Sequence, residues 1–220
     1  RGTFRALDAV GLADVEVVHL RNANPPRAIL NYVEGAKVSL LVAADDGSGA
    51  TRTNPTRTGE RLIKLASPGV MLLDLDAKSG EEAGRIVVTA GDTYGRSALR
   101  EAATLLDEDG VLVPLVVTPP FGERAEEHAR TEVELAIREA GLEPSEHIQP
   151  EVVVSSQSTR SIARASRGAD LLLLGGSSSR SIGRLRATPG WGRKGSGGTA
   201  IGVFRHARPG KVGSLSSKLE

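Results

Sequence analysis

The stretch of sequence that decides the fold is residues 170–179, Asp-Leu-Leu-Leu-Leu-Gly-Gly-Ser-Ser-Ser. Four consecutive leucines run into a short loop of glycine and serine. A short apolar run with turn residues on both sides is typical of a strand buried on both faces, as in a parallel sheet. In α/β proteins, a glycine-rich turn at the carboxyl end of such a strand is a common ligand site, because backbone N–H groups are accessible there. The stretch therefore predicts an α/β fold and one candidate binding loop.

The composition limits the classes of function. The chain has 220 residues, which is enough for one large or two small domains. Its 28 basic and 27 acidic residues give a net charge of +1, so we expect no general attraction to nucleic acid. There is no cysteine, which excludes disulfides, thiolate chemistry and cysteine-based zinc sites, and fits a reducing compartment.

The two ends of the sequence suggest a piece of a longer protein. The chain begins with Arg1 and not Met, and it ends in Lys218-Leu219-Glu220, which is typical of a vector remnant. No apolar run approaches the roughly 20 residues that cross a bilayer, and no signal peptide is present. We therefore interpret the chain as a soluble piece excised from a larger protein.

Hydrophobic periodicity predicts strands that alternate with helices, most regularly from residue 84 onward. This alternation indicates right-handed crossovers and a parallel sheet with helices on both faces. The expected strands are residues 15–20, 38–43, 70–75, 85–90, 111–118, 150–155, 171–174 and 200–204. The expected helices are residues 25–35, 60–66, 97–106, 123–140 and 158–167.

The two halves of the chain repeat each other at a nearly constant offset. Val10-Gly11-Leu12 matches Ala140-Gly141-Leu142, and Gly35-Ala36 before an apolar run matches Gly168-Ala169 before another. Matches in the same order indicate a duplication. We expect an incomplete first unit at 1–78, a second unit at 84–206, and a basic tail with the vector remnant at 207–220. The first unit lacks its opening strand–helix–strand, which either lies upstream or comes from a partner chain, because bare strand edges are costly.

At this point the pattern resembles the universal stress protein fold, which is of the adenine nucleotide alpha hydrolase-like type. The second unit carries the resemblance in Arg-Ile-Val-Val-Thr-Ala-Gly-Asp-Thr (85–93), Gly-Ala-Asp-Leu-Leu-Leu-Leu-Gly-Gly (168–176) and Ala-Ile-Gly-Val-Phe (200–204). The first unit carries it in Lys-Val-Ser-Leu-Leu-Val-Ala-Ala-Asp-Asp (37–46) and Ala-Ser-Pro-Gly-Val-Met-Leu-Leu (66–73). The resemblance implies a doubly wound parallel sheet in two tandem units, the first incomplete.

The resemblance also implies a nucleotide site. Members of that family that bind ATP carry an Asp directly after the first strand and spaced glycines after the fourth. Here Gly91 stands at the Asp position with Asp92 next, and Ser178 replaces a glycine. Amide donors, hydroxyls and a guanidinium suit phosphate oxygens. The candidate residues for binding ATP or another adenine nucleotide are Asp92, Gly175, Gly176, Ser177, Ser178 and Arg180.

A plainer interpretation of the same residues stays open. Glycine and serine after a strand often only make turns. Asp92 is also well placed to cap the helix that follows it. The four histidines, His19, His128, His147 and His206, have no metal-ligand spacing. We recognise no catalytic motif and expect no enzyme activity.

Such domains also occur as cytoplasmic tails of amino-acid permeases, cation/proton antiporters and relatives of cation–chloride cotransporters. The resemblance thus implies a non-catalytic regulatory domain on the cytoplasmic side, tethered to the inner membrane through the parent transporter. We expect it to dimerise and to sense a nucleotide. Residues 180–218 hold nine Lys or Arg and no acid, which suits contact with anionic lipid. The alternative is a stand-alone tandem universal stress protein that binds ATP.

Overall fold

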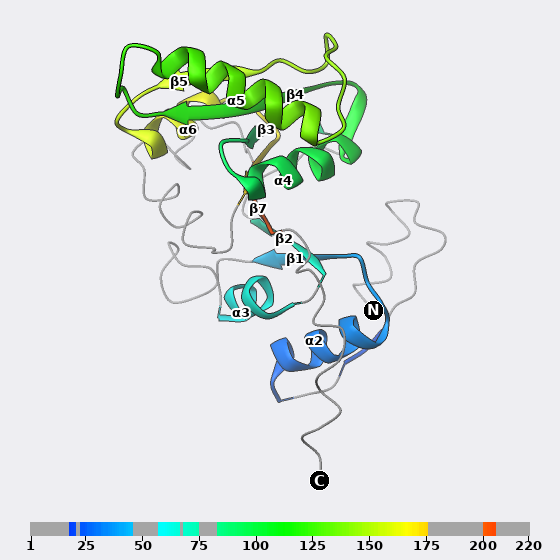
Figure 1. Cartoon of the computed structure of the whole chain (residues 1–220). Helices are drawn as coiled ribbons and strands as arrows, with labels where there is room; N and C mark the ends of the chain where they lie inside the picture. Colours follow the sequence, from blue (N-terminus) through cyan, green and yellow to red (C-terminus); the bar gives the residue numbers. More distant parts are fainter. Residues whose placement is uncertain are drawn as a thin grey trace.

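Seven strands and the helices beside them form the described part of the chain (Figure 1). The structure, a computed structural model, describes residues 18–20, 23–45, 57–66, 68–74, 83–175 and 200–205. In chain order the elements are α2 (Pro25–Gly35), β1 (Leu40–Asp45), α3 (Arg57–Leu65), β2 (Gly69–Asp74), β3 (Ala83–Thr89), α4 (Thr93–Thr104), β4 (Leu106–Thr118), α5 (Ala125–Glu139), β5 (Glu151–Val154), α6 (Ser158–Ala165), β6 (Leu171–Gly175) and β7 (Ala200–Arg205).

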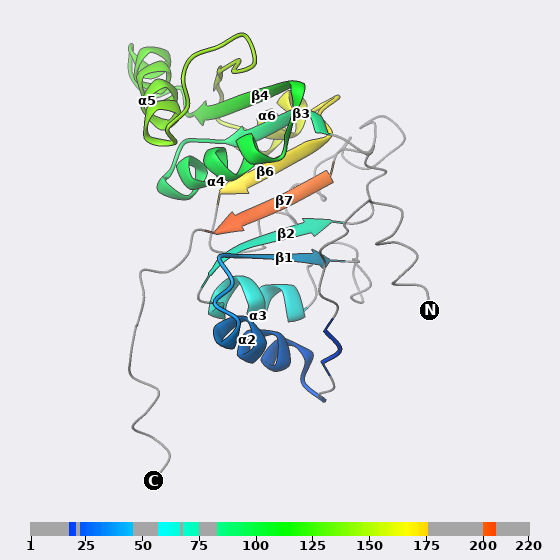
Figure 2. The ribbon, with the colours of Figure 1, turned by 90° about the vertical axis from the view of Figure 1, so that its right-hand side faces the viewer.

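All seven strands belong to one sheet, in the order β1-β2-β7-β6-β3-β4-β5. Neighbouring strands run parallel, except for the antiparallel pair of β2 and β7 at the join between the two halves. Figure 2 shows this reversal, with the arrows of β1 and β2 pointing against those of β7 and β6. The expected fold class, a doubly wound parallel α/β sheet, is confirmed, and the antiparallel pair of β2 and β7 is the one departure from it among the described strands.

Helices cover both faces of the sheet. α4 and α5 pack on one face, where Leu99 and Val133 join a core with Ile86 and Val88 of β3. α3 and α6 lie on the other face, where Val87 of β3 belongs to a second core. Successive side chains of β3 therefore enter opposite cores, and Ile86, Val87 and Val88 are each 0% exposed. This double burial explains why the central strands are continuous apolar runs rather than alternating ones.

Local sequence signals place the helices near their expected positions, although α4 begins at Thr93 rather than at residue 97, and β4 begins at Leu106 rather than at residue 111. The side chain of Asn24 caps α2, and two prolines occupy its first turn. The stripe of α5 buries Ala129, Val133 and Ile137 at helical spacing. The chain leaves α5 at Gly141, whose φ of +76° is the left-handed conformation that glycine adopts without strain.

The two halves are related by a local twofold axis. Leu40 pairs with Gly69 in the first half and Leu171 pairs with Ala200 in the second, so both strands are displaced by the same 131 positions (171 minus 40, and 200 minus 69). The antiparallel ladder joins Leu72 to Val203, which are themselves 131 positions apart (203 minus 72). The axis therefore passes through this pair. β2 of the first half and β7 of the second half are equivalent strands, and they pair with each other across this axis.

The prediction of a strand at 15–20 is wrong for residues 18–20, the part of it that the structure describes. Residues 18–20, the end of the strand expected at 15–20, lie outside any strand, and Val18 and Leu20 are 39% and 44% exposed. A strand needs a neighbour for its backbone hydrogen bonds. The corresponding strand of the second half, β5, pairs with β4, and the described part of the first half holds no counterpart of β4. The expected tail at 207–220 and most of the basic run at 180–218 lie outside the described residues.

Candidate functional site

The carboxyl ends of β3 and β6 and the first turn of α4 form the strand-end site, defined here by Thr89, Asp92, Tyr94, Gly95 and Gly175. The chain leaves β3 towards β4 on one side of the sheet, whereas it leaves β6 towards β7 on the other side. Ligands of open α/β sheets bind where the strand order changes direction in this way. The topology thus puts two of the predicted site residues, Asp92 and Gly175, at one end of adjacent strands.

Asp92 is the N-cap of α4. One carboxylate oxygen, Oδ1, accepts a hydrogen bond from the backbone N–H of Gly95 at 2.6 Å, and the Asp92 carbonyl accepts from the N–H of Arg96 at 3.1 Å. This is the capping role that the plainer interpretation gave to the residue. The residue is nevertheless exposed to solvent, and a carboxylate has acceptor capacity beyond one bond.

Gly175 brings β6 into direct backbone contact with α4. Its N–H donates to Oγ1 of Thr89 at 3.2 Å, which joins the ends of β6 and β3. A Cβ at this position would lie 2.6 Å from the carbonyl carbon of Tyr94 and would overlap the backbone of Gly95. Glycine is therefore required here for the close approach of strand and helix.

Gly95 has the same role from the helix side. A Cβ there would lie 2.8 Å from the Cα of Ala90 and would overlap the carbonyl oxygen of Thr89. The pair Gly95 and Gly175 fixes the N-terminus of α4 against the strand ends. A helix N-terminus carries partial positive charge and unpaired N–H groups, which favour an anion nearby.

Sequence reasoning missed Thr89, Tyr94 and Gly95. The signal available was Gly95 itself, because a glycine inside a helical pattern often marks a close packing contact. Tyr94 lies in the first turn of α4 and is 39% exposed, so part of its ring remains accessible at this site. The predicted residues Gly176, Ser177, Ser178 and Arg180 lie outside the described part of the chain.

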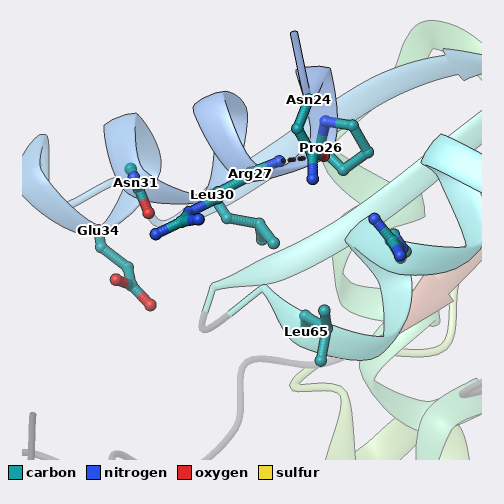
Figure 3. Close-up of a pocket in the computed structure, with 8 residues that line it drawn as sticks. Asn24, Pro26, Arg27, Leu30, Asn31, Glu34 and Leu65 are labelled. Carbon is teal, nitrogen blue, oxygen red and sulfur yellow. Dashed lines mark hydrogen bonds between the residues drawn. The ribbon is translucent and has the colours of Figure 1, made fainter. Parts of the chain in front are cut away.

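A second candidate is an open groove between α2 and α3, with a volume of about 400 Å³. Figure 3 shows Leu30 of α2 and Leu65 of α3 on its two sides, with Glu34 near the far end of α2. Leu65 is 57% exposed. The lining residues are Asn24, Pro26, Arg27, Leu30, Asn31, Glu34, Arg61 and Leu65. Because this lining mixes both charges with apolar side chains, it does not select one class of ligand.

Neither candidate resembles a metal centre. Across the described ranges, no three His, Cys, Asp or Glu side chains gather closely enough to hold a metal ion.

Solved structures supply the comparison for this fold. A universal stress protein from Archaeoglobus fulgidus DSM 4304 superposes with a TM-score of 0.57 at 13% identity, covering 93% of this chain and 75% of its own. The fold is that of the universal stress proteins. A second universal stress protein structure, described as putative and from Pseudomonas aeruginosa UCBPP-PA14, has a TM-score of 0.57 at 13% identity and covers 92% and 76% of the two chains.

A third neighbour, a functionally unknown protein from Pseudomonas aeruginosa PAO1, has a TM-score of 0.56 at 14% identity, with coverage of 92% and 76%. No family model matches the sequence, and no curated protein matches it. The universal stress protein-like fold confirms that part of the resemblance. At such low identity it establishes the fold and not the activity.

Proposed function

We propose that this chain is a non-catalytic regulatory domain that binds an adenine nucleotide at the strand-end site. The observation that carries the proposal is the placement of the α4 N-terminus at the point where the strand order changes direction. Backbone N–H groups and the helix dipole there suit phosphate oxygens. The carboxylate of Asp92, an exposed residue, suits a hydroxyl of the ribose or an amino group of the base, which are hydrogen-bond donors.

Binding rather than catalysis is the better account of the described residues. At this site Asp92 is already engaged by the helix it caps, which suits a fixed anchor more than a group that must take and release protons. The loop at 176–180, outside the described residues, follows directly from Gly175. Its hydroxyls and Arg180 would complete the phosphate contacts in this proposal.

Calorimetric titration with ATP and Mg²⁺ tests the nucleotide site. We expect saturable binding, weakened about tenfold by Asp92→Asn, because one hydrogen bond to a charged group is lost. Asparagine also caps helices well, so the thermal midpoint should hardly move, which separates binding from folding. No heat at millimolar ATP would refute the proposed function. Wild-type affinity in Asp92→Asn would leave Asp92 as a cap alone.

We further propose that the domain regulates a membrane transporter as part of a homodimer, with the basic stretch at 180–218 against anionic lipid. No helix among the described residues is long and apolar enough to cross a bilayer, and this proposal puts the membrane-spanning segments elsewhere in the parent protein. Fractionation of the producing cells tests it. The proposal expects the chain's epitope in the membrane pellet, resistant to high salt.

The alternative is a stand-alone tandem universal stress protein that binds ATP. Two of the three neighbours favour it, since both are described as universal stress proteins. It expects the epitope in the supernatant of the same fractionation. Recovery there, at the mass of a protein without a membrane part, would overturn the transporter proposal and leave the nucleotide site intact.

A further inference from the structure

Positive and negative charges are separated along this chain, although they nearly cancel overall. Residues 1–157 hold 16 Lys or Arg and 25 Asp or Glu, whereas residues 158–219 hold 12 Lys or Arg and one Asp. The change of sign falls at the start of α6 (Ser158–Ala165). The last part of the chain is therefore strongly basic, and α6 is the helix that begins it.

The helices on the two faces of the sheet differ in charge. α3 and α6, which cover one face, together hold five Lys or Arg and one Glu. α4 and α5, which cover the other face, hold four Arg and six Glu. On this acidic face Arg96 pairs with Glu139, and Arg130 pairs with Glu126 at 2.7 Å. Carboxylates thus lie beside arginines on the face that α4 and α5 cover.

Arg160, Arg164 and Arg167 form the arginine row, a line of exposed residues along α6 and the turn after it. Their spacing of four and three residues puts them on one side of the helix. Among the described residues, no carboxylate forms an ion pair with any of the three. Arg160 donates to the neutral amide oxygen of Gln157 at 2.8 Å. Glu151 lines one groove together with Arg164 and does not pair with it.

The stability of α6 does not explain the row. Like charges at helical spacing repel each other, and the first turn of a helix, where Arg160 lies, favours acidic residues. Arg164 lies in the last turn, where the helix dipole favours a cation, so the dipole accounts for the C-terminal end of the row but not for Arg160. The row is therefore better suited to contact with a negatively charged surface than to support of the helix.

Two features favour a lipid surface over a nucleic acid. A duplex is read by a helix that enters its major groove, whereas α6 lies on the sheet and packs against β4. In addition, Phe121 in the loop after β4 is 79% exposed. This loop and the one that leads into α6 leave the sheet together, since Thr118 pairs with Val154 and its carbonyl accepts from the N–H of Ser155 at 2.8 Å. Basic residues near an exposed aromatic side chain are typical of a surface that lies at the headgroups of a bilayer.

We infer that the arginine row contacts the headgroups of anionic lipids. The row adds to the membrane contact proposed above, on which this inference rests, and gives that contact a face of the fold. A guanidinium fork binds two oxygens of a lipid phosphate at once. The basic stretch at 180–218 adds to the same attraction. α4 and α5 lie on the opposite face of the sheet, so their acidic excess points away from the bilayer.

Flotation of the full chain with lipid vesicles tests this inference. We expect the wild-type chain to bind vesicles of phosphatidylcholine and phosphatidylglycerol in equal parts, and not vesicles of phosphatidylcholine alone. Arg160→Gln with Arg164→Gln should weaken binding about tenfold or more, because each arginine near such a surface contributes about fivefold. The matched control, Arg130→Gln with Arg138→Gln, removes the same charge from two exposed arginines of α5 and should change binding less than about twofold.

Arg160→Lys with Arg164→Lys keeps the charge and should retain most of the binding, and circular dichroism checks that each variant is folded. Equal losses in the two glutamine variants would show that net charge alone matters and would overturn the inference. Unchanged binding of the α6 glutamine variant would also overturn it and leave the contact proposed for 180–218 in place. Failure of the wild-type chain to bind mixed vesicles would overturn it as well, while the cell fractionation still tests the transporter proposal separately. Binding to duplex DNA that is tighter than binding to vesicles, and that the same variant loses, would assign the row to nucleic acid instead.

Discussion

Replacing Arg205 should destabilise the fold more specifically than any other substitution considered below. It is the last residue of β7 and is 3% exposed, and it lies beside the carboxyl end of α3. Its Nε donates to the carbonyl of Ile63 at 2.6 Å, while Nη2 donates to the carbonyls of Ala66 at 2.5 Å and Pro68 at 3.1 Å. The guanidinium thus satisfies carbonyls at the end of a helix where the dipole favours a cation.

The cost of removing the guanidinium follows from these three bonds. Arg205→Ala leaves three carbonyls without this donor in a buried place, and each orphaned group costs about 1–3 kcal/mol before relaxation and water entry. A hydrogen bond to a charged group contributes about 1.5–3 kcal/mol, and the contributions of three bonds to one side chain do not add fully. We expect a loss of about 3–5 kcal/mol, which is a large share of the 5–15 kcal/mol typical of whole domains.

Urea unfolding followed by circular dichroism measures this loss, with Arg205→Lys as the matched control. Lysine keeps the charge but replaces the planar fork by a point charge, so it should recover about half of the stability. Hydrogen exchange should show the first loss of protection in α3, which Arg205 joins to the sheet. An Arg205→Ala midpoint equal to that of the wild type would refute the reasoning. Equal loss in the Lys and Ala variants would show that the charge contributes nothing.

Three further predictions concern the strand-end site and the local twofold. Gly175→Ala should destabilise by about 1–3 kcal/mol because its Cβ overlaps the backbone of α4, whereas Gly84→Ala, whose Cβ meets only an oxygen at 3.6 Å, should be tolerated in thermal unfolding. Asp92→Ala should cost about 1 kcal/mol through loss of the cap and Asp92→Asn almost nothing, so equal losses in urea would contradict the capping role. Leu173→Ala should cost about 2–5 kcal/mol and Val42→Ala less than about 0.5 kcal/mol, although the two positions are equivalent by symmetry; similar losses would mean that Val42 is covered in solution.

The positions of helices were predictable where the sequence contains residues that typically begin or end a helix. Asn24 and the prolines after it mark the start of α2, and Gly141 marks the end of α5. The strand expected at 15–20 failed over its described end because its apolar pattern says nothing about whether a neighbouring strand exists. Hydrophobic periodicity indicates which face of a segment is apolar. Whether the segment forms a strand depends on a neighbouring strand with which it can pair.

Two of the five residues that define the strand-end site were predictable. Asp92 and Gly175 could be found because they follow apolar strands, and the ends of adjacent parallel strands meet. Thr89, through its side-chain Oγ1, and Gly95, through its backbone, complete the contact from positions 86 and 80 residues away from Gly175 along the chain (175 minus 89, and 175 minus 95). Gly95 alone could suggest a close packing contact, but the local sequence does not indicate which distant segment makes it.

The sequence alone predicted a two-unit repeat, and it determined the order of most helices and strands and the apolar runs that become central strands, because these runs depend on spacing and burial preference within a few residues. Tertiary structure decided how the halves join, through an antiparallel pair centred on Leu72 and Val203. It also decided that Arg205 of β7 donates a hydrogen bond to a carbonyl of α3 and that β1 lies at an edge of the sheet. These features depend on which distant segments come within hydrogen-bonding distance, and local patterns of hydrophobicity do not encode that choice.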